Sequence, residues 1–149
     1  MCLTFSGLVM GGGIESTCHK YGLFHLICRA YELVLGDGTV TWASPEQNQE
    51  LFMTIPFSYG TLGFLVSVDI DIVPYKPYIE LTYHNVKSLD QVVAKFTEVT
   101  KNPEVDSVEG IMYSLNKAVI MSGKFVDKVP NGGNYNALGR YAICFCTGL

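Results

Sequence analysis

The sequence contains few charged residues for its length. Lys, Arg, Asp and Glu make up 16% of the 149 residues, whereas roughly a quarter is usual for a soluble domain. The basic residues are scattered and the net charge is −4, so the basic stripe of a nucleic-acid-binding protein is missing. We therefore expect no nucleic-acid partner. The apolar fraction of 48% predicts either a surface that other protein covers or a piece of a larger protein.

Paired cysteines and long apolar runs are also missing. The five cysteines form no C-x-x-C pair, which is typical of reduced thiols inside a cell and excludes a disulfide scaffold. Cys144 and Cys146 have no His or further Cys nearby, so we expect no metal site. No apolar run reaches the roughly 18 residues that span a bilayer, and no signal-peptide pattern opens the chain.

Glycine, by contrast, is concentrated near the N-terminus. Gly11, Gly12 and Gly13 follow a short apolar run and precede a polar, hydroxyl-rich segment. Glycine tolerates positive φ and brings backbone N–H groups close to a ligand, and successive N–H groups in a tight turn favour an anion such as phosphate. A flexible loop is the alternative interpretation, because a glycine cluster alone is a weak motif.

Local patterns in the first half predict short helices and strands. Residues 3–10 indicate a buried strand or a turn into the glycines. Residues 27–35 and 39–42 flank an Asp-Gly dipeptide, which is a strong hairpin signal. Ser44 followed by Pro45 and Gln47 predicts that a helix begins there with a capping box. Residues 64–73 alternate, which predicts a strand with the apolar side chains from Phe64 to Ile72 on one face and a wet opposite face.

The pattern restarts after the prolines at 74 and 77, where we place a domain boundary. Residues 78–83 predict a strand, and Ser88 with Gln91 predicts a second capping box before a helix that ends near Asn102. Residues 108–113 and 118–126 predict two further strands. This β-α-β-β order predicts an α+β layer, with the helix on one face of an antiparallel sheet.

Several ordered segments resemble the delta-24-sterol reductases, a family with a PCMH-type (vanillyl-alcohol-oxidase-type) FAD domain. They read GLVMGGGIESTCHKYGLF, YELVLGDGTV, SPEQNQELF, GTLGFLV and VEGIMYSLNKAVIMSG. The resemblance runs from Leu3 to about Tyr135. It implies an α+β fold in which residues 1–74 are the second half of the FAD-binding domain and residues 75–134 begin the substrate domain, followed by a divergent tail at 135–149.

The resemblance also implies where FAD lies. It places the cofactor against residues 4–14, mostly along their backbone, and the adenine side of the cofactor against the turn and first strand residues at 60–65, so these segments must share one cleft. The cofactor-contact residues that it implies are Thr4, Gly7, Met10, Gly11, Gly12, Gly13, Ile14, Glu15, Ser16, Gly63, Phe64 and Leu65. For Thr4 and Met10, core packing is the open alternative.

His19, Lys20 and Tyr21 are the candidates for catalysis. Lys20 can neutralise a phosphate or stabilise a reduced flavin, His19 can relay a proton, and Tyr21 can stack or donate a hydrogen bond. Each is otherwise an ordinary surface or turn residue. The implied reaction is reduction of the side-chain double bond of a sterol, with NADPH as the hydride donor to FAD.

The resemblance finally implies an enzyme of the endoplasmic-reticulum membrane, anchored by an N-terminal segment that we expect to lie outside this chain. We expect the first half of the flavin domain to be missing too, so that the chain by itself retains FAD weakly or not at all. Two alternatives stay open. In the first, the chain is a truncated, non-catalytic fragment that binds a partner, such as a full-length copy, or is inactive. In the second, it is part of an FAD-linked oxidase of another small substrate.

Overall fold

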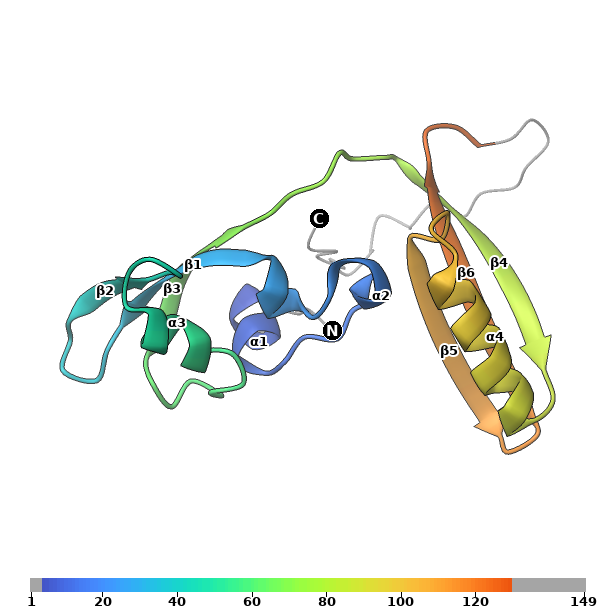
Figure 1. Ribbon diagram of the computed structural model, residues 1–149, viewed down its shortest axis with the longest axis horizontal. Helices are drawn as coiled ribbons and strands as arrows, with labels where there is room; N and C mark the ends of the chain where they lie inside the picture. The colour runs from blue at the N-terminus through green and yellow to red at the C-terminus, as the bar shows by residue number, and fades with distance from the viewer. Residues whose placement is uncertain (1–3, 130–149) are drawn as a thin grey trace, which may run out of the picture. The chain divides into compact units, whose positions relative to one another are not determined.

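The computed structural model describes residues 4–129, and their contacts form two compact units (Figure 1). Unit 1 holds residues 4–15 and 21–73, and unit 2 holds Ser16–Lys20 and residues 74–129. Each unit contains one three-stranded antiparallel sheet with helices, so the predicted α+β class is confirmed. The predicted tail at 135–149 lies outside the described residues, and the assignment of domains to a longer enzyme stays a prediction.

The sheet of unit 1 has β1 (Cys28–Val34) between β2 (Val40–Ala43) and β3 (Phe64–Ile70). The predicted hairpin is present: β1 and β2 pair antiparallel, and Gly38 turns the chain with a φ of +85°. The core of this unit gathers side chains from all the elements around the sheet. Its fully buried members include Val9, Tyr31, Leu33, Ala43 and Ile55.

The apolar segment before the glycines is a helix, α1 (Phe5–Met10), so the prediction of a strand or turn there is wrong. Thr4 caps its N-terminus, because the Thr4 hydroxyl accepts a hydrogen bond from the Gly7 amide at 3.1 Å. At the other end Gly12 has a φ of +76° and the Gly13 amide donates to the Leu8 carbonyl at 2.7 Å. This is a Schellman-type ending, which favours glycine because the residue after the helix must adopt a left-handed backbone.

The helix predicted at Ser44 begins later than expected. The Ser44 hydroxyl accepts hydrogen bonds from the amides of Glu46 and Gln47, as in a capping box, but these bonds close a turn instead of opening a helix. The helix α3 (Gln49–Thr54) begins only after Asn48. The left-handed backbone of Asn48, with a φ of 53°, separates the turn at Ser44 from the helix. The same side-chain chemistry suits a serine turn and an N-cap, which explains the displaced start.

A bulge in β3 changes which side chains face the core. Glu32 pairs with Ser67 but its neighbour Leu33 pairs with Leu65, so Val66 is an extra residue. Because one extra residue exchanges the two faces of a strand, Leu65 is buried while Phe64 and Val66 are 74% and 53% exposed. The prediction of one continuous apolar face is therefore wrong for its first part, and β3 ends before Ile72.

Unit 2 follows the predicted β-α-β-β order, with β4 (Tyr78–Val86), α4 (Leu89–Lys101), β5 (Ser107–Ser114) and β6 (Lys117–Val126). The central strand is β6, and α4 lies along one face of the sheet (Figure 1). The predicted cap is present, since the Ser88 hydroxyl accepts from the Gln91 amide at 3.3 Å. The core between helix and sheet consists of Val86, Val99, Val108, Ala118 and Ile120.

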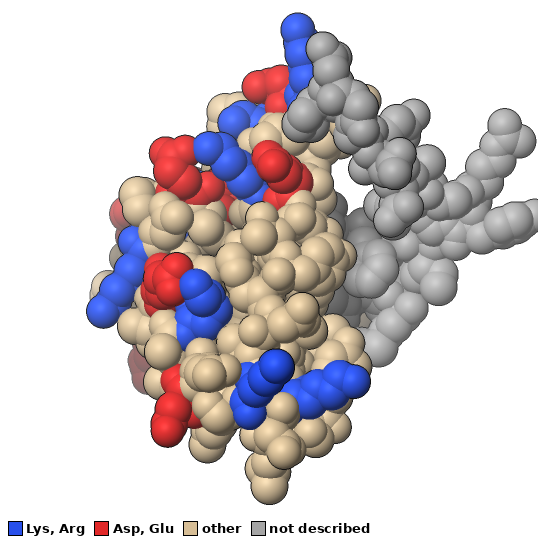
Figure 2. Space-filling view, turned by 90° about the vertical axis from the view of Figure 1, so that its right-hand side faces the viewer, with Lys and Arg blue, Asp and Glu red and all other residues tan. Residues whose placement is uncertain are grey.

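The sheet face opposite α4 is apolar and open to solvent. The exposed side chains that alternate with the core positions there are Ile79, Leu81, Tyr83, Ile111 and Tyr113. Figure 2 shows one face of the molecule on which Lys and Arg intermingle with Asp and Glu and a wide neighbouring area carries none of them. The exposed apolar side chains of this sheet face agree with the low charge content of the sequence.

Candidate functional site: a glycine-lined cleft

A cleft of about 360 Å³ opens in unit 1 where α1 meets the chain that leads into β3. Its lining divides between two segments: Ser6, Gly7, Met10 and Gly11 come from α1 and its C-terminal end, and Tyr59, Gly60, Gly63, Phe64 and Leu65 come from the second segment. Gly11, the first residue of the triple glycine, and the turn at residues 60–65 therefore line the same cleft, as the flavin interpretation requires.

Backbone hydrogen bonds hold the two segments together. The Tyr59 amide donates to the Met10 carbonyl at 3.0 Å, and the Phe57 amide approaches the Val9 carbonyl at 3.4 Å. Gly60 reverses the chain with a φ of +78°. A Cβ at Gly63 would lie 2.9 Å from the Val34 carbonyl oxygen, so only glycine lets the chain pass this close to the end of β1.

The chemistry of the cleft is apolar and uncharged. Met10 and Leu65 are buried in its wall, and Ser6 and Tyr59 bring hydroxyl groups. The bulge in β3 leaves the ring of Phe64 exposed at the cleft. An aromatic ring, two hydroxyls and close backbone suit a flat, mostly uncharged part of a ligand, because π-systems stack on such rings and few polar groups suffice for orientation.

The triple glycine does not form the expected nest of free amides. The Gly11 amide donates to the Gly7 carbonyl at 2.9 Å and the Gly13 amide to the Leu8 carbonyl at 2.7 Å. Both donors are used to end α1, and a helix C-terminus carries partial negative charge that disfavours an anion. The expected free amides at Gly11 and Gly13 are therefore not present in the structure, and the contact of these residues with FAD stays a prediction. Gly12 and Gly13 permit the chain to turn tightly against Phe57 and Leu8, respectively.

The cleft brings together only part of the predicted cofactor residues. Gly7, Met10, Gly11, Gly63, Phe64 and Leu65 line it. The others lie elsewhere: Thr4 caps α1, Gly12 contacts Phe57, Gly13 contacts Leu8, and Ile14 is 81% exposed. Glu15 follows in unit 1, and Ser16 belongs to unit 2.

Sequence reasoning missed Ser6 and Tyr59 in the lining. A helical interpretation of residues 5–10 would have placed Ser6, Gly7 and Met10 on one face, since residues three and four apart are neighbours. No local signal points to Tyr59, because it reaches the cleft through its backbone bond to Met10.

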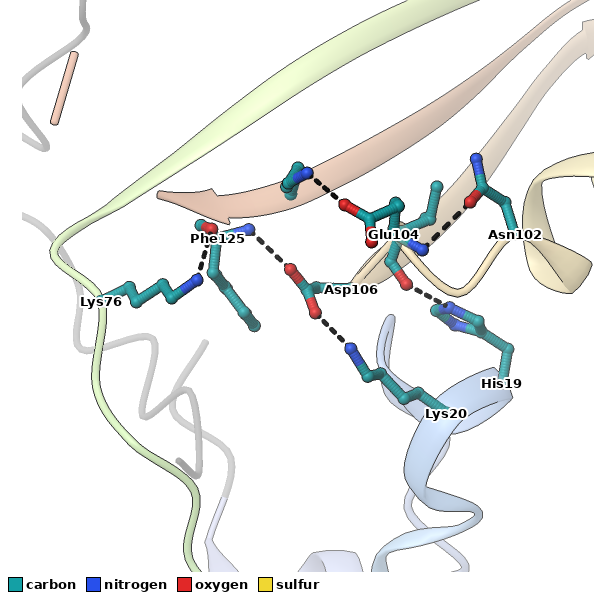
Figure 3. Close-up of polar contacts among 9 residues, drawn as sticks. His19, Lys20, Lys76, Asn102, Glu104, Asp106 and Phe125 are labelled. Atoms are coloured by element: carbon teal, nitrogen blue, oxygen red, sulfur yellow. Dashed lines mark hydrogen bonds and ion pairs between the residues drawn. The ribbon is translucent and has the colours of Figure 1, made fainter. Parts of the chain in front are cut away.

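Two of the three candidates for catalysis make contacts within unit 2 (Figure 3). The His19 ring Nε2 lies 3.1 Å from the Val105 carbonyl oxygen, and the Lys20 ammonium lies 2.5 Å from the Asp106 carboxylate. These contacts give His19 and Lys20 a structural part. Their roles in catalysis, and that of Tyr21 at the end of α2 (Cys18–Tyr21), stay predictions.

The environment of Asp106 favours its charged form. Burial raises the pKa of this carboxyl group, but the hydrogen bond from Lys20 and the one from the Phe125 amide outweigh burial, so the pKa lies below its ordinary value. Lys76 adds attraction from the segment before β4 and donates to the Phe125 carbonyl. The neighbouring Lys124 is paired with Glu104.

Within residues 4–129, no group of three His, Cys, Asp or Glu side chains is placed to hold a metal ion. Over the same range, none of the helices has the length and apolar character that crossing a membrane requires. Cys144 and Cys146 lie outside the described residues.

The fold is that of part of a known oxidase structure. The crystal structure of 6-hydroxy-D-nicotine oxidase from Arthrobacter nicotinovorans matches 83% of this chain and 29% of its own with a TM-score of 0.57, at 19% identity. At that identity the match shows the fold alone. No model of a known protein family matches the sequence.

The sequence is similar to Delta(24)-sterol reductases over nearly its whole length, which confirms the resemblance of its motifs. The Delta(24)-sterol reductase of Macaca fascicularis is 49% identical over 139 residues, which are 93% of this chain and 27% of that protein. The FAD-dependent monooxygenase tpcD of Cochliobolus heterostrophus is 28% identical over 90% of the chain and 25% of its own. The chain thus spans about a quarter of the length of these curated relatives.

Proposed function

We propose that the chain is part of an FAD-linked oxidoreductase that reduces the side-chain double bond of a sterol, with NADPH as hydride donor. The support is the 49% identity to a Delta(24)-sterol reductase and the likeness to a protein named as FAD-dependent. A sterol partner and a place at the endoplasmic-reticulum membrane belong to the same proposal.

The observation that carries the proposal is the shared cleft. Two segments separated by about fifty residues of sequence, α1 and the start of β3, were expected to meet the same cofactor, and both line one cleft. Core packing alone would not require this, because Phe64 is exposed at the cleft instead of contributing to the core.

The residues of the cleft fit the isoalloxazine ring of FAD better than its phosphates. Phe64 and Tyr59 offer aromatic surface, Ser6 and Tyr59 offer hydroxyls, and Gly7 and Gly60 let backbone approach closely. No charged side chain lines the cleft within the described residues, so the phosphates need donors from other protein. FAD, when bound, supplies the hydride chemistry, whereas the protein supplies binding and orientation.

Ligand titration tests this assignment. Flavin fluorescence is measured as the chain is added to FAD or riboflavin, and ADP is tested as a competitor. We expect weak binding of both flavins with similar affinity, and no competition by ADP, because the cleft is proposed to bind the isoalloxazine ring, which ADP lacks. Strong competition by ADP would mean that the cleft binds the adenine side of FAD. That outcome, or no flavin binding even at high protein concentration, would contradict the cleft as a site for the isoalloxazine ring.

Phe64→Ala and Val66→Ala form a matched pair for the same titration. Both side chains are exposed on β3, but only Phe64 lines the cleft. Loss of one aromatic stack lowers affinity by roughly 2- to 12-fold, from about 0.5–1.5 kcal/mol, whereas Val66→Ala is expected to have no effect. Equal effects of the two substitutions would remove Phe64 from the site.

The reaction itself is tested by sterol analysis. A Δ24-sterol, NADPH and FAD are incubated with the chain alone and with the chain joined to the remaining length of a sterol reductase, and the products are separated by gas chromatography and mass spectrometry. We expect saturated product only from the joined protein, because the chain spans about a quarter of its relatives.

A non-catalytic role is the second candidate, favoured by the open apolar face of unit 2. Exposed apolar area of this kind promotes association, and a full-length copy of the protein is the partner that we propose. Co-purification of the chain with a full-length relative, and its loss on Tyr83→Lys, would favour this role. A chain that remains a stable monomer and does not bind the full-length protein would count against this role.

A further inference from the structure

Ser16–Lys20 interrupts the sequence of unit 1 but is bound within unit 2. Among the described residues the chain therefore passes between the units at 15/16, 20/21 and 73/74. The segment begins three residues after the triple glycine and ends before Gly22, whose φ is +81°. The segment therefore follows the glycine bend closely in the sequence while its own contacts belong to unit 2.

Three contacts attach the segment to the strand that begins at Ser107 and to the residues before it. The Val108 amide donates to the Ser16 carbonyl at 2.7 Å, the His19 ring lies against the Val105 carbonyl, and Lys20 pairs with Asp106. Figure 3 shows His19 and Lys20 pointing from the same short helix toward these partners.

Asp106 is the centre of this attachment. One carboxylate oxygen accepts from the Lys20 ammonium and the other from the Phe125 amide at 2.8 Å. The Asp106 amide itself donates to the Gly123 carbonyl at 2.8 Å. The side chain is only 15% exposed. The bonds to β6 thus orient the carboxylate independently of Lys20. A charge-assisted pair with one oriented partner is stronger than a pair between two mobile side chains.

We propose that Asp106 is a positioning residue that latches Ser16–Lys20 onto unit 2 through Lys20. The latch holds His19 and Lys20 in place against the residues that lead into β5. Its existence is independent of any cofactor, whereas its consequence for flavin binding rests on the function proposed above.

Amide hydrogen exchange of the full chain, measured without flavin, tests the latch. The variants are Lys20→Met and Asp106→Asn. Glu104→Gln is the matched control, because it breaks the nearby Lys124 pair and removes none of the three contacts of the segment; Glu104 acts on Lys20 only through its charge, without a direct contact. We expect exchange of Ser16–Lys20 and of the Val108 amide to become on the order of tenfold faster in the first two variants. This is the low end for a hydrogen bond to a charged group, since Lys20 is 35% exposed.

Two further variants separate a specific latch from general loss of structure. Lys20→Arg keeps the charge and is expected to restore protection to within about threefold of the original. The double variant Lys20→Met with Asp106→Asn is expected to be no worse than either single one, because the two residues act through one interaction.

The proposal is overturned if Lys20→Met and Asp106→Asn leave exchange within twofold of the original, or if Glu104→Gln has the same effect. It is also overturned if the amides of β6 lose protection equally, since that outcome is unfolding of unit 2. Failure of the flavin titrations leaves these measurements unchanged, so the two proposals fail separately.

Discussion

Gly12→Ala probes the physical reason for the triple glycine. Gly12 has a left-handed backbone, and a Cβ added there would lie 2.1 Å from the Phe57 ring. Phe57 is 47% exposed, but its ring packs against His25 at 5.2 Å between centroids, so moving the ring aside would lose this contact. The substitution therefore combines backbone strain with a steric overlap.

Two other glycines of unit 1 separate these contributions. Gly38 also has positive φ, at +85°, but nothing lies within 4 Å of its added Cβ, and Gly36 has neither constraint. Gly38→Ala isolates the left-handed backbone, which costs about 1–2 kcal/mol for an L-residue. Gly36→Ala is expected to be neutral or to stabilise by up to about 1 kcal/mol, through the unfolded chain.

Gly12→Ala adds the overlap with Phe57 to the backbone term. Overpacking costs about 1–3 kcal/mol, so the free energy of unfolding is expected to fall by about 2–5 kcal/mol. Displacement of Phe57 also strains the segment that brings Tyr59 to the cleft, since both residues bond to the end of α1. Weaker riboflavin binding is therefore expected along with the lower stability.

Urea unfolding followed by tryptophan fluorescence measures all three variants. Trp42 is the one tryptophan of the chain and lies in β2 of unit 1, so its signal reports on the unit that carries the three glycines. The expected order of stability is Gly36→Ala, then Gly38→Ala, then Gly12→Ala. If Gly12→Ala is no less stable than Gly38→Ala, the contact with Phe57 contributes nothing and the explanation is refuted.

Three further perturbations concern unit 2 and are followed by circular dichroism or hydrogen exchange. Ser88→Ala removes the cap of α4 and is expected to lower the free energy of unfolding by about 1 kcal/mol; no change in the urea midpoint would exclude a stabilising cap. Ile120→Ala empties a buried core position and is expected to cost about 2–5 kcal/mol; a cost under 1 kcal/mol would mean that the core collapses around it. Because the pKa of Asp106 is lowered, its stabilisation is present above the ordinary Asp value and is lost as pH falls through the lowered one. Exchange protection of Ser16–Lys20 is thus expected to hold to about pH 4 and to fall below it, and a pH profile unchanged by Asp106→Asn would contradict this.

The sequence predicted unit 2 well because its signals are local. Ser88 and Gln91 mark the start of α4, and each strand of the sheet follows within a few residues of the turn before it. The hairpin of β1 and β2 was predictable for the same reason, since Asp37 and Gly38 supply the turn chemistry.

The site in unit 1 could be predicted only in part, because non-local contacts decide its details. The bulge at Val66 depends on the pairing register of β3 with β1, and no local sequence pattern predicts it. Likewise, nothing near Lys20 in the sequence indicates that its partner is Asp106, 86 positions away. The resemblance located the segments of the cleft, but not which side chains face it.

The use of the glycines alters what the flavin assignment requires of the rest of the protein. The amides of Gly11 and Gly13 are consumed by the end of α1, and the cation nearest in sequence, Lys20, is paired with Asp106. A dinucleotide carries charge on its pyrophosphate, and that charge needs donors or cations to be bound out of water. The ring and the phosphates of FAD must then be recognised by different parts of the protein. In the proposed function the cleft of unit 1 binds the isoalloxazine ring. The affinity of the chain for FAD is then expected to match its affinity for riboflavin, and any gain from the phosphates measures what other protein contributes.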